Sequence, residues 1–390
     1  MRKVFAAFIV MVLVSFALSA KEAYYSAVIN GSYLSDFAYG MLPVSLWGDF
    51  GISGIELAKD LDTKIYARLE AGLDQRTVFQ DPVTGNLLEN VSGNDYTVAF
   101  SDGSIVYEQG ILDNKYDKTL PDILTAAVIM RMRWEQAFAD FSDIRKGNYA
   151  GVFSNSDLFP DTLSSQYLLG TPELGGGKYF LSNSIETKLV FNLMDDDYIA
   201  PEGYSGEMSI LFAPWFLLNK LSGFSGTQTD AFRMNLDFRY KHTFVSEREL
   251  FSGRNRYSLY IDISLKNQLL TGTAVPRYLM KTSFMGRRIP PRTYMMSFSS
   301  TLWFAGPEVL SKGTYPGTYV YFENAISGGE LLNSRNQSGF NFLGGFGIGA
   351  DMHIMGLLRV FFEYKYIYTK IPGEKTGSDF SLGGYLTVLF

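Results

Sequence analysis

Cysteine is absent from the 390-residue sequence. Disulfides, thiolate metal sites, cysteine nucleophiles and lipid attachment to an N-terminal cysteine are therefore excluded. Charged residues are also scarce, at 19% of the chain, whereas a soluble domain usually carries about a quarter. The net charge of −6 is the wrong sign for a nucleic-acid partner, which attracts basic surfaces.

Histidine is the next scarcity, with two residues in the chain. His242 falls on the apolar face of an alternating run, near its end, a position typical of interface anchors. His353 falls in an expected tight turn between two runs. Neither has a metal-ligand partner at useful spacing, and no pair of carboxylates is singled out for acid–base chemistry. We therefore predict no enzyme activity, no cofactor and no metal site.

Three consecutive carboxylates, Asp195, Asp196 and Asp197, permit two interpretations. They are either a calcium site, because hard cations prefer oxygen ligands, or a solvated acidic turn. Consecutive carboxylates point in different directions and no complete ligand loop surrounds them, which favours the turn.

Long apolar runs are confined to the start of the chain. Arg2 and Lys3 precede the apolar run 4–18, which ends in small residues. This layout is typical of a cleavable secretory signal, whereas an anchor helix needs a longer apolar stretch. We predict a signal peptide at 1–20, cleaved after Ser19 or Ala20, and a single domain at 21–390.

Aromatic residues are abundant, at 15% of the chain, and many lie in runs of period two. In 231–244, AFRMNLDFRYKHTF, an apolar series from Phe232 to Phe244 interleaves with a polar series from Arg233 to Thr243. A strand places two such series on opposite faces, whereas a helix would mix them. Clusters of Gly, Pro, Asn and Asp separate the runs, as turns do.

Thirteen alternating runs are found, and a weaker one at 24–35 makes fourteen, because single-chain bacterial barrels have even strand numbers. The sequence therefore predicts an all-β fold, a transmembrane antiparallel up-and-down β-barrel of about 14 strands (12–16). The thirteen runs are 46–58, 64–73, 95–108, 122–136, 182–194, 206–219, 231–244, 257–269, 290–304, 317–327, 337–352, 358–369 and 378–390.

Two segments depart from simple alternation. The long loop 138–181, with Pro160 and Pro172, is expected to be a surface cap or a lumen plug. The glycine-rich stretch 344–349 continues the alternation, so we interpret it as a flat strand where the barrel kinks or another segment packs closely, and not as a phosphate loop.

The chain ends in SLGGYLTVLF, an alternating strand that closes on a terminal aromatic residue. This ending resembles the C-terminal signature of bacterial outer-membrane β-barrel proteins, although Leu386 and Val388 stand where an aromatic residue is often seen. The resemblance implies an assembly signal at Leu386, Val388 and Phe390, recognition by the barrel-assembly machinery, and an outer-membrane location in contact with lipids. Chain length and strand number are loosely similar to porins and to long-chain fatty-acid transporters.

Charged residues of both signs fall on the polar face of the strands. Such charges are tolerated in water or in a tight ion-pair network, because an arginine facing hydrocarbon costs about 2–4 kcal/mol. The candidate pore-lining residues are Arg68, Glu70, Arg131, Arg133, Arg233, Asp237, Arg239, Lys241, Asp262, Lys266, Arg359, Glu363 and Lys365. We predict a pore or channel for small solutes. The alternative interpretation of the inward charges is a salt-bridged, packed interior with no open channel. The alternative functions are a surface-binding (adhesin) or structural barrel, or a transporter of hydrophobic, fatty-acid-type ligands.

Overall fold

The computed structural model describes residues 22–36, 39–41, 44–53, 61–77, 87, 95–113, 122–138, 180–195, 200–217, 220–221, 230–247, 257–272, 275–280, 283–285, 287–307, 313–332, 337–354, 358–371 and 374–389. The predicted signal peptide, most of the loop 138–181, Asp196, Asp197 and Phe390 lie outside these residues. Among the described residues, no helix is long and apolar enough to cross a membrane.

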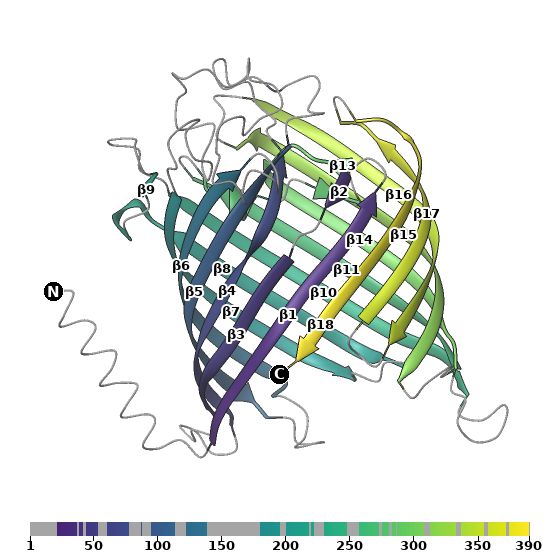
Figure 1. Ribbon diagram of the computed structural model, residues 1–390, viewed down its shortest axis with the longest axis horizontal. Coiled ribbons are helices and arrows are strands. Elements are labelled where there is room, and N and C mark those ends of the chain that lie inside the picture. Colours follow the sequence, from purple (N-terminus) through teal and green to yellow (C-terminus); the bar gives the residue numbers. More distant parts are fainter. Residues whose placement is uncertain are drawn as a thin grey trace.

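Within the described part of the chain, fourteen long antiparallel strands form one wall, which confirms the predicted number (Figure 1). They are β1 (Glu22–Asp36), β3 (Val44–Ser53), β4 (Thr63–Thr77), β5 (Asp95–Leu112), β6 (Leu124–Phe138), β7 (Phe180–Asp195), β8 (Glu202–Ala213), β10 (Ala231–Glu247), β11 (Tyr257–Thr271), β14 (Arg292–Ala305), β15 (Thr314–Leu331), β16 (Ser338–Ile354), β17 (Leu358–Thr369) and β18 (Gly377–Leu389).

Short elements lie between the long strands. They are the strands β2 (Tyr39–Met41), β9 (Lys220–Leu221), β12 (Ser283–Phe284) and β13 (Arg287–Arg288), and the 3-10 turns η2 (Trp215–Leu217) and η3 (Arg277–Leu279). β2 pairs with the end of β1, and β9 pairs with the start of β7. Among the described elements, β12 and β13 pair only with each other.

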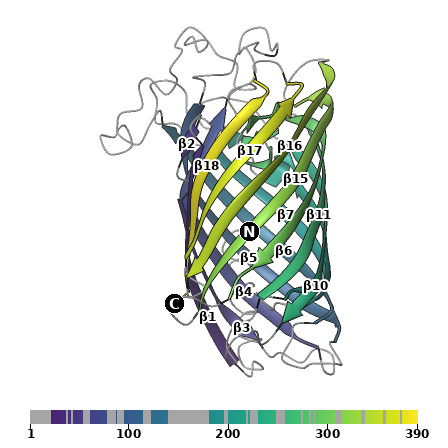
Figure 2. The ribbon, with the colours of Figure 1, turned by 90° about the vertical axis from the view of Figure 1, so that its right-hand side faces the viewer.

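The sheet returns to its first strand. β1 pairs with β18 from Val28↔Leu389 to Asp36↔Ser381, and every other wall strand pairs with its neighbours in chain order. Two candidate assembly-signal residues lie in this seam, because Leu386 is opposite Gly31 and Val388 is opposite Ile29. Figure 2 shows the resulting cylinder. We call the end that holds Glu22 and Leu389 the terminal end, and the opposite one the loop end.

The two strand faces differ sharply in polarity, as the alternation predicts. On β10, the even-numbered Phe232, Leu236, Phe238 and Phe244 are exposed on the outside of the barrel. His242 lies among them near the terminal end, between the rings of Tyr240 and Phe244. An outer surface this apolar needs lipid around it.

Two sequence-based expectations are wrong in detail. The strand expected at 206–219 is β8, which ends at Ala213 because Pro214 has no N–H for the ladder. His353 does not lie in a turn: it is in β16, where it pairs with Arg359 of β17. The strand simply continues to Ile354, so the turn is shorter than the sequence suggested.

Candidate functional site: the barrel lumen

The predicted pore-lining residues all lie on the strand face opposite the exposed apolar residues. Arg68 and Glu70 flank the outward Leu69, and Arg131 and Arg133 flank the outward Met132. The same alternation holds for Arg233, Asp237, Arg239 and Lys241 on β10, for Asp262 and Lys266 on β11, and for Arg359, Glu363 and Lys365 on β17. The structure thus brings these residues together around one interior.

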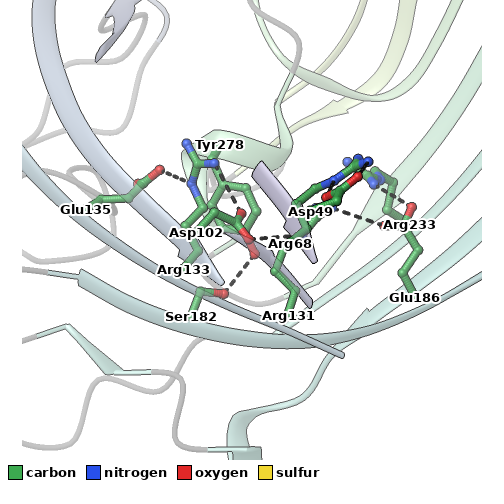
Figure 3. A network of polar contacts seen from close by, with 10 residues as sticks. All are labelled: Asp49, Arg68, Asp102, Arg131, Arg133, Glu135, Ser182, Glu186, Arg233 and Tyr278. Atoms are coloured by element: carbon green, nitrogen blue, oxygen red, sulfur yellow. Dashed lines mark hydrogen bonds and ion pairs between the residues drawn. The ribbon is translucent and has the colours of Figure 1, made fainter. Parts of the chain in front are cut away.

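Three arginines and three carboxylates of this interior form a continuous chain across β5, β6, β7 and β10 (Figure 3). Arg133 Nε donates to Glu135 Oε1 at 2.7 Å, and its Nη1 lies 3.5 Å from Asp102 Oδ2. Arg131 links Asp102 to Glu186, with 3.4 Å between Nε and Asp102 Oδ1 and 3.8 Å between Nη2 and Glu186 Oε2.

Arg233 Nη2 ends this chain with a donated hydrogen bond of 3.1 Å to Glu186 Oε1. Glu135 and Glu186 are buried, and such carboxylates are tolerated in a protein only when paired. Three acidic and three basic groups balance along the chain, so together they carry no net formal charge. The inner wall at β5, β6, β7 and β10 therefore has the salt-bridged character that was considered from the sequence.

A second set of contacts holds arginines over aromatic rings. Arg68 donates to both carboxylate oxygens of Asp49, at 2.7 and 2.8 Å, and its Cζ lies 4.5 Å from the centroid of the Trp47 ring. Arg133 Cζ lies 4.0 Å from the Phe100 centroid and 4.8 Å from the Tyr278 centroid. Cation–π contacts of this kind fix the guanidinium planes.

Tyr278 does not belong to the wall. It lies in the connection between β11 and β14, which folds into the barrel at the loop end (Figures 1 and 3). We call residues 275–280, 283–285 and 287–291 the lumen segment. The Tyr278 and Ser182 hydroxyl oxygens are 2.9 Å apart. Loss of solvent raises the pKa of Tyr278, so its hydroxyl stays protonated at neutral pH.

The first half of the lumen segment packs on inward positions of β8, β10 and β11. Val275, Leu279 and Met280 form a buried cluster with Leu211 and Leu270. Leu211 alternates with the exposed Ile210 and Phe212 of the same strand, so its side chain faces the interior. The inner wall of the barrel therefore has an apolar patch, and the lumen segment covers it.

The second half packs against the next arc of the wall, from β14 to β18. Ile289 belongs to a buried cluster with Met295, Leu343 and Ile367, from β14, β16 and β17. Arg287 forms ion pairs with Asp379 of β18 and with Glu374. The contacts of the lumen segment thus run from β6 around to β18, so the segment narrows the interior at the loop end.

A recess of about 500 Å³, with both polar and apolar lining residues, lies along β8, β10, β11 and β14 and also contacts Val190 of β7. Its hydroxyl groups come from Ser205, Ser264, Ser299 and Thr301. Its charged groups come from Glu207, Asp237, Arg239, Asp262 and Lys266, and Trp303 supplies an aromatic ring. Four of the predicted pore-lining residues therefore share one cavity.

An aromatic row runs beside this recess toward β17. The register places Tyr260, Trp303, Tyr319, Gly349 and Glu363 opposite one another on five neighbouring strands. The centroids of the Trp303 and Tyr319 rings are 4.3 Å apart. A Cβ at Gly349 would collide with the Tyr319 ring, and one at Gly347 with the Tyr321 ring. The glycine stretch is therefore a strand on which another segment packs closely, as expected from the sequence.

Sequence reasoning missed the lumen segment and looked for a plug in 138–181 instead. A signal was available: the connection between β11 and β14 contains Tyr278, Leu279, Met280, Phe284 and Met285. Solvated loops seldom carry so many large apolar residues, since surface loops are dominated by small and polar ones. An apolar loop between two membrane strands needs an interior to pack into.

Comparisons with known proteins return structural neighbours only. No family model matches the sequence, and no curated protein matches it. BamA of Haemophilus ducreyi lacking POTRA domains 1–3 is 9% identical, with 93% of this chain and 70% of that chain covered and a TM-score of 0.46. OmpF of Salmonella typhi, in complex with daunomycin, is 9% identical, with 95% and 97% covered and a TM-score of 0.34.

OmpT of Vibrio cholerae with loop L8 deleted, an outer membrane protein, is 8% identical, with 94% and 99% covered and a TM-score of 0.33. The fold assignment rests on the molecule's own geometry. The returning antiparallel sheet, its apolar outer face and its charged inner face are those of a transmembrane β-barrel.

Proposed function

We propose that this barrel is an outer-membrane pore through which small, hydrated solutes pass, narrowed at the loop end by the lumen segment. The observation that carries the proposal is the recess of about 500 Å³, whose lining includes charges of both signs. Fourteen-stranded lumens are wider than side chains alone normally fill. The charged and hydroxyl groups of the recess suit hydrated solutes, whereas a fatty-acid-type ligand would need a pocket without charges.

The salt-bridged wall and the pore are compatible. The chain from Glu135 to Arg233 occupies β5, β6, β7 and β10 near the loop end, whereas the recess lies on β8, β10, β11 and β14. The paired charges give the first wall a fixed shape, and the recess leaves room for water on the second. Within this proposal, the leader 1–20 directs secretion and the barrel-assembly machinery inserts the chain into the lipid bilayer.

Planar-bilayer conductance of the refolded mature protein tests the proposal. We expect discrete ionic current steps, and swelling of liposomes in small polar solutes. Protein that was denatured and not refolded is the control for leakage. A silent bilayer together with no solute uptake by liposomes would remove the pore function and leave a structural or surface-binding barrel.

A further inference from the structure

The recess on β8, β10, β11 and β14 is built as a grid of inward side chains. One row holds Glu207, Asp237 and Lys266, and the next holds Ser205, Arg239, Ser264 and Ser299. A third row places Asp262 opposite Thr301, and Trp303 follows one step further toward the terminal end. Ionic groups, hydroxyls and an aromatic ring are thus arranged in successive rows along one wall.

The charges of the recess are compensated inside the wall. Arg239 Nε donates to Asp262 Oδ1 at 2.9 Å, and Arg239 Nη2 donates to Asp262 Oδ2. Lys188 Nζ donates to Glu207 Oε1 at 2.9 Å, and Asp237 lies directly opposite Lys266 in the ladder. A charged solute entering the recess would give up water without meeting a net opposite charge. The balance favours a solute that is polar and uncharged.

The hydrogen-bonding inventory specifies this solute further. Arg239 retains donors outside its contact with Asp262, and the Asp262 carboxylate retains lone pairs, because a guanidinium has five N–H groups and a carboxylate about four acceptor sites. Donors and acceptors side by side match neighbouring hydroxyl groups, each of which both donates and accepts. Ser205 and Thr301 add further hydroxyls on either side of the pair.

Trp303 supplies the apolar surface of the recess. Its ring is partly exposed and has three close neighbours. They are Tyr319, with centroids 4.3 Å apart, Tyr260, with centroids 6.1 Å apart, and Arg359, whose Cζ lies 5.2 Å from the Trp303 centroid. A sugar ring has an apolar C–H face and a polar hydroxyl rim. The fixed indole is complementary to the first, and the neighbouring hydroxyls and ion pairs are complementary to the second.

We propose that this recess is a binding site for an uncharged saccharide, which stacks on Trp303 and hydrogen-bonds to the Arg239–Asp262 pair. The inference rests on the proposed pore function, since it names the solute class that the pore takes. A volume of about 500 Å³ lies within the range of about 300–1,000 Å³ that holds small-molecule ligands.

The test uses the refolded full-length mature barrel and maltose as the probe. Maltose binding is measured by titration calorimetry in detergent, and maltose-induced interruptions of the ionic current are measured in planar bilayers. Trp303→Ala should weaken both effects about tenfold, and Trp303→Phe, which keeps an aromatic ring, should weaken them less. Asp262→Asn should also reduce binding, and sodium glucuronate should bind less tightly than maltose.

Trp47→Ala is the matched control, because Trp47 is an inner-wall tryptophan of β3 stacked on Arg68 and does not line the recess. It should leave maltose binding unchanged. Far-UV circular dichroism verifies that each variant is folded.

The outcomes separate the inference from the function on which it rests. Ionic conductance without maltose binding or current interruption overturns the saccharide site and keeps the pore. If Trp47→Ala and Trp303→Ala weaken maltose binding equally, the saccharide does not bind in the recess beside Trp303. Maltose binding that depends on Trp303 in a barrel without conductance keeps the binding site and removes the pore.

Discussion

Tyr319 on β15 donates a hydrogen bond of 2.7 Å from its hydroxyl to Glu363 Oε1 on β17. The intervening strand β16 has Gly349 at this level, so the tyrosine ring lies across the strand where a side chain would otherwise stand. The contact joins three neighbouring strands through one side chain. The same hydrogen bond fixes the position of the Tyr319 ring, which packs against Trp303.

Gly349→Ala tests this arrangement. The new methyl group would collide with the Tyr319 ring, and overpacking of this kind costs about 1–3 kcal/mol. We expect the midpoint of urea unfolding from lipid vesicles, followed by tryptophan fluorescence, to fall. Gly103→Ala is the matched control, because a Cβ there meets only Leu69 at an ordinary 3.6 Å. Equal losses in both variants would contradict the packing argument.

Glu186→Gln tests the ion chain on the opposite wall. Glu186 is buried and faces both Arg131 and Arg233, so the amide would leave two guanidinium groups with reduced compensation. Breaking a buried pair costs about 3–5 kcal/mol, and we expect a clear loss in the free energy of unfolding. Glu202→Gln removes an exposed carboxylate that contacts His242, where exposed pairs contribute about 0–1 kcal/mol. Similar losses in both variants would show that the chain does not act as a buried network.

The period-two pattern was sufficient to predict the wall and the side of each residue. In a strand, parity alone assigns Arg233 and Arg239 to one face and Phe232 and Phe238 to the other. Each residue of such a strand faces either the lipid outside or the interior of the barrel. The outward apolar face and the inward charges therefore follow from local sequence, whereas the fourteenth strand was added because single-chain bacterial barrels have even strand numbers.

Pairing partners do not follow from local sequence. Whether Arg239 meets Asp262 depends on the register between β10 and β11, which includes an irregularity between Thr243 and Val245. A shift of one residue would invert faces, and a shift of two would change every ion pair without changing the pattern. The lumen segment was missed for a related reason: its apolar residues gain a partner only when distant strands close around them.

Arg239→Gln and Asp262→Asn should shift the ion selectivity of the pore in opposite directions. Each variant leaves one unbalanced charge in the recess, a carboxylate in the first and a guanidinium in the second, and a fixed charge in a lumen attracts its counter-ion. Reversal potentials across a potassium chloride gradient should move toward cation selectivity for Arg239→Gln and toward anion selectivity for Asp262→Asn. Shifts of the same sign, with conductance intact, would place the pair outside the conduction path.

Arg287→Gln should increase single-channel conductance. The change removes the ion pairs of the lumen segment with Asp379 and Glu374, so the segment loses this attachment to β18. Arg292→Gln removes the same charge at the start of β14, where Nη1 donates to the carbonyl oxygens of Gly329 and Gln337. Conductance should change less in this control. An unchanged Arg287→Gln channel would show that the segment does not narrow the path.

Neighbouring residues on β14 allow a direct test of the two faces. The sequence has no cysteine, so Thr301→Cys and Leu302→Cys each introduce the single thiol of the chain. Thr301 lines the recess, whereas Leu302 is exposed on the outer surface, where lipid excludes water. In lipid vesicles, a charged methanethiosulfonate reagent should modify Thr301→Cys quickly and Leu302→Cys slowly, because thiolate formation and reagent access both require water. After unfolding in urea, both thiols should react at the same rate. Equal rates in vesicles would mean that Leu302 does not face lipid, and the assignment of inner and outer faces would fail with it.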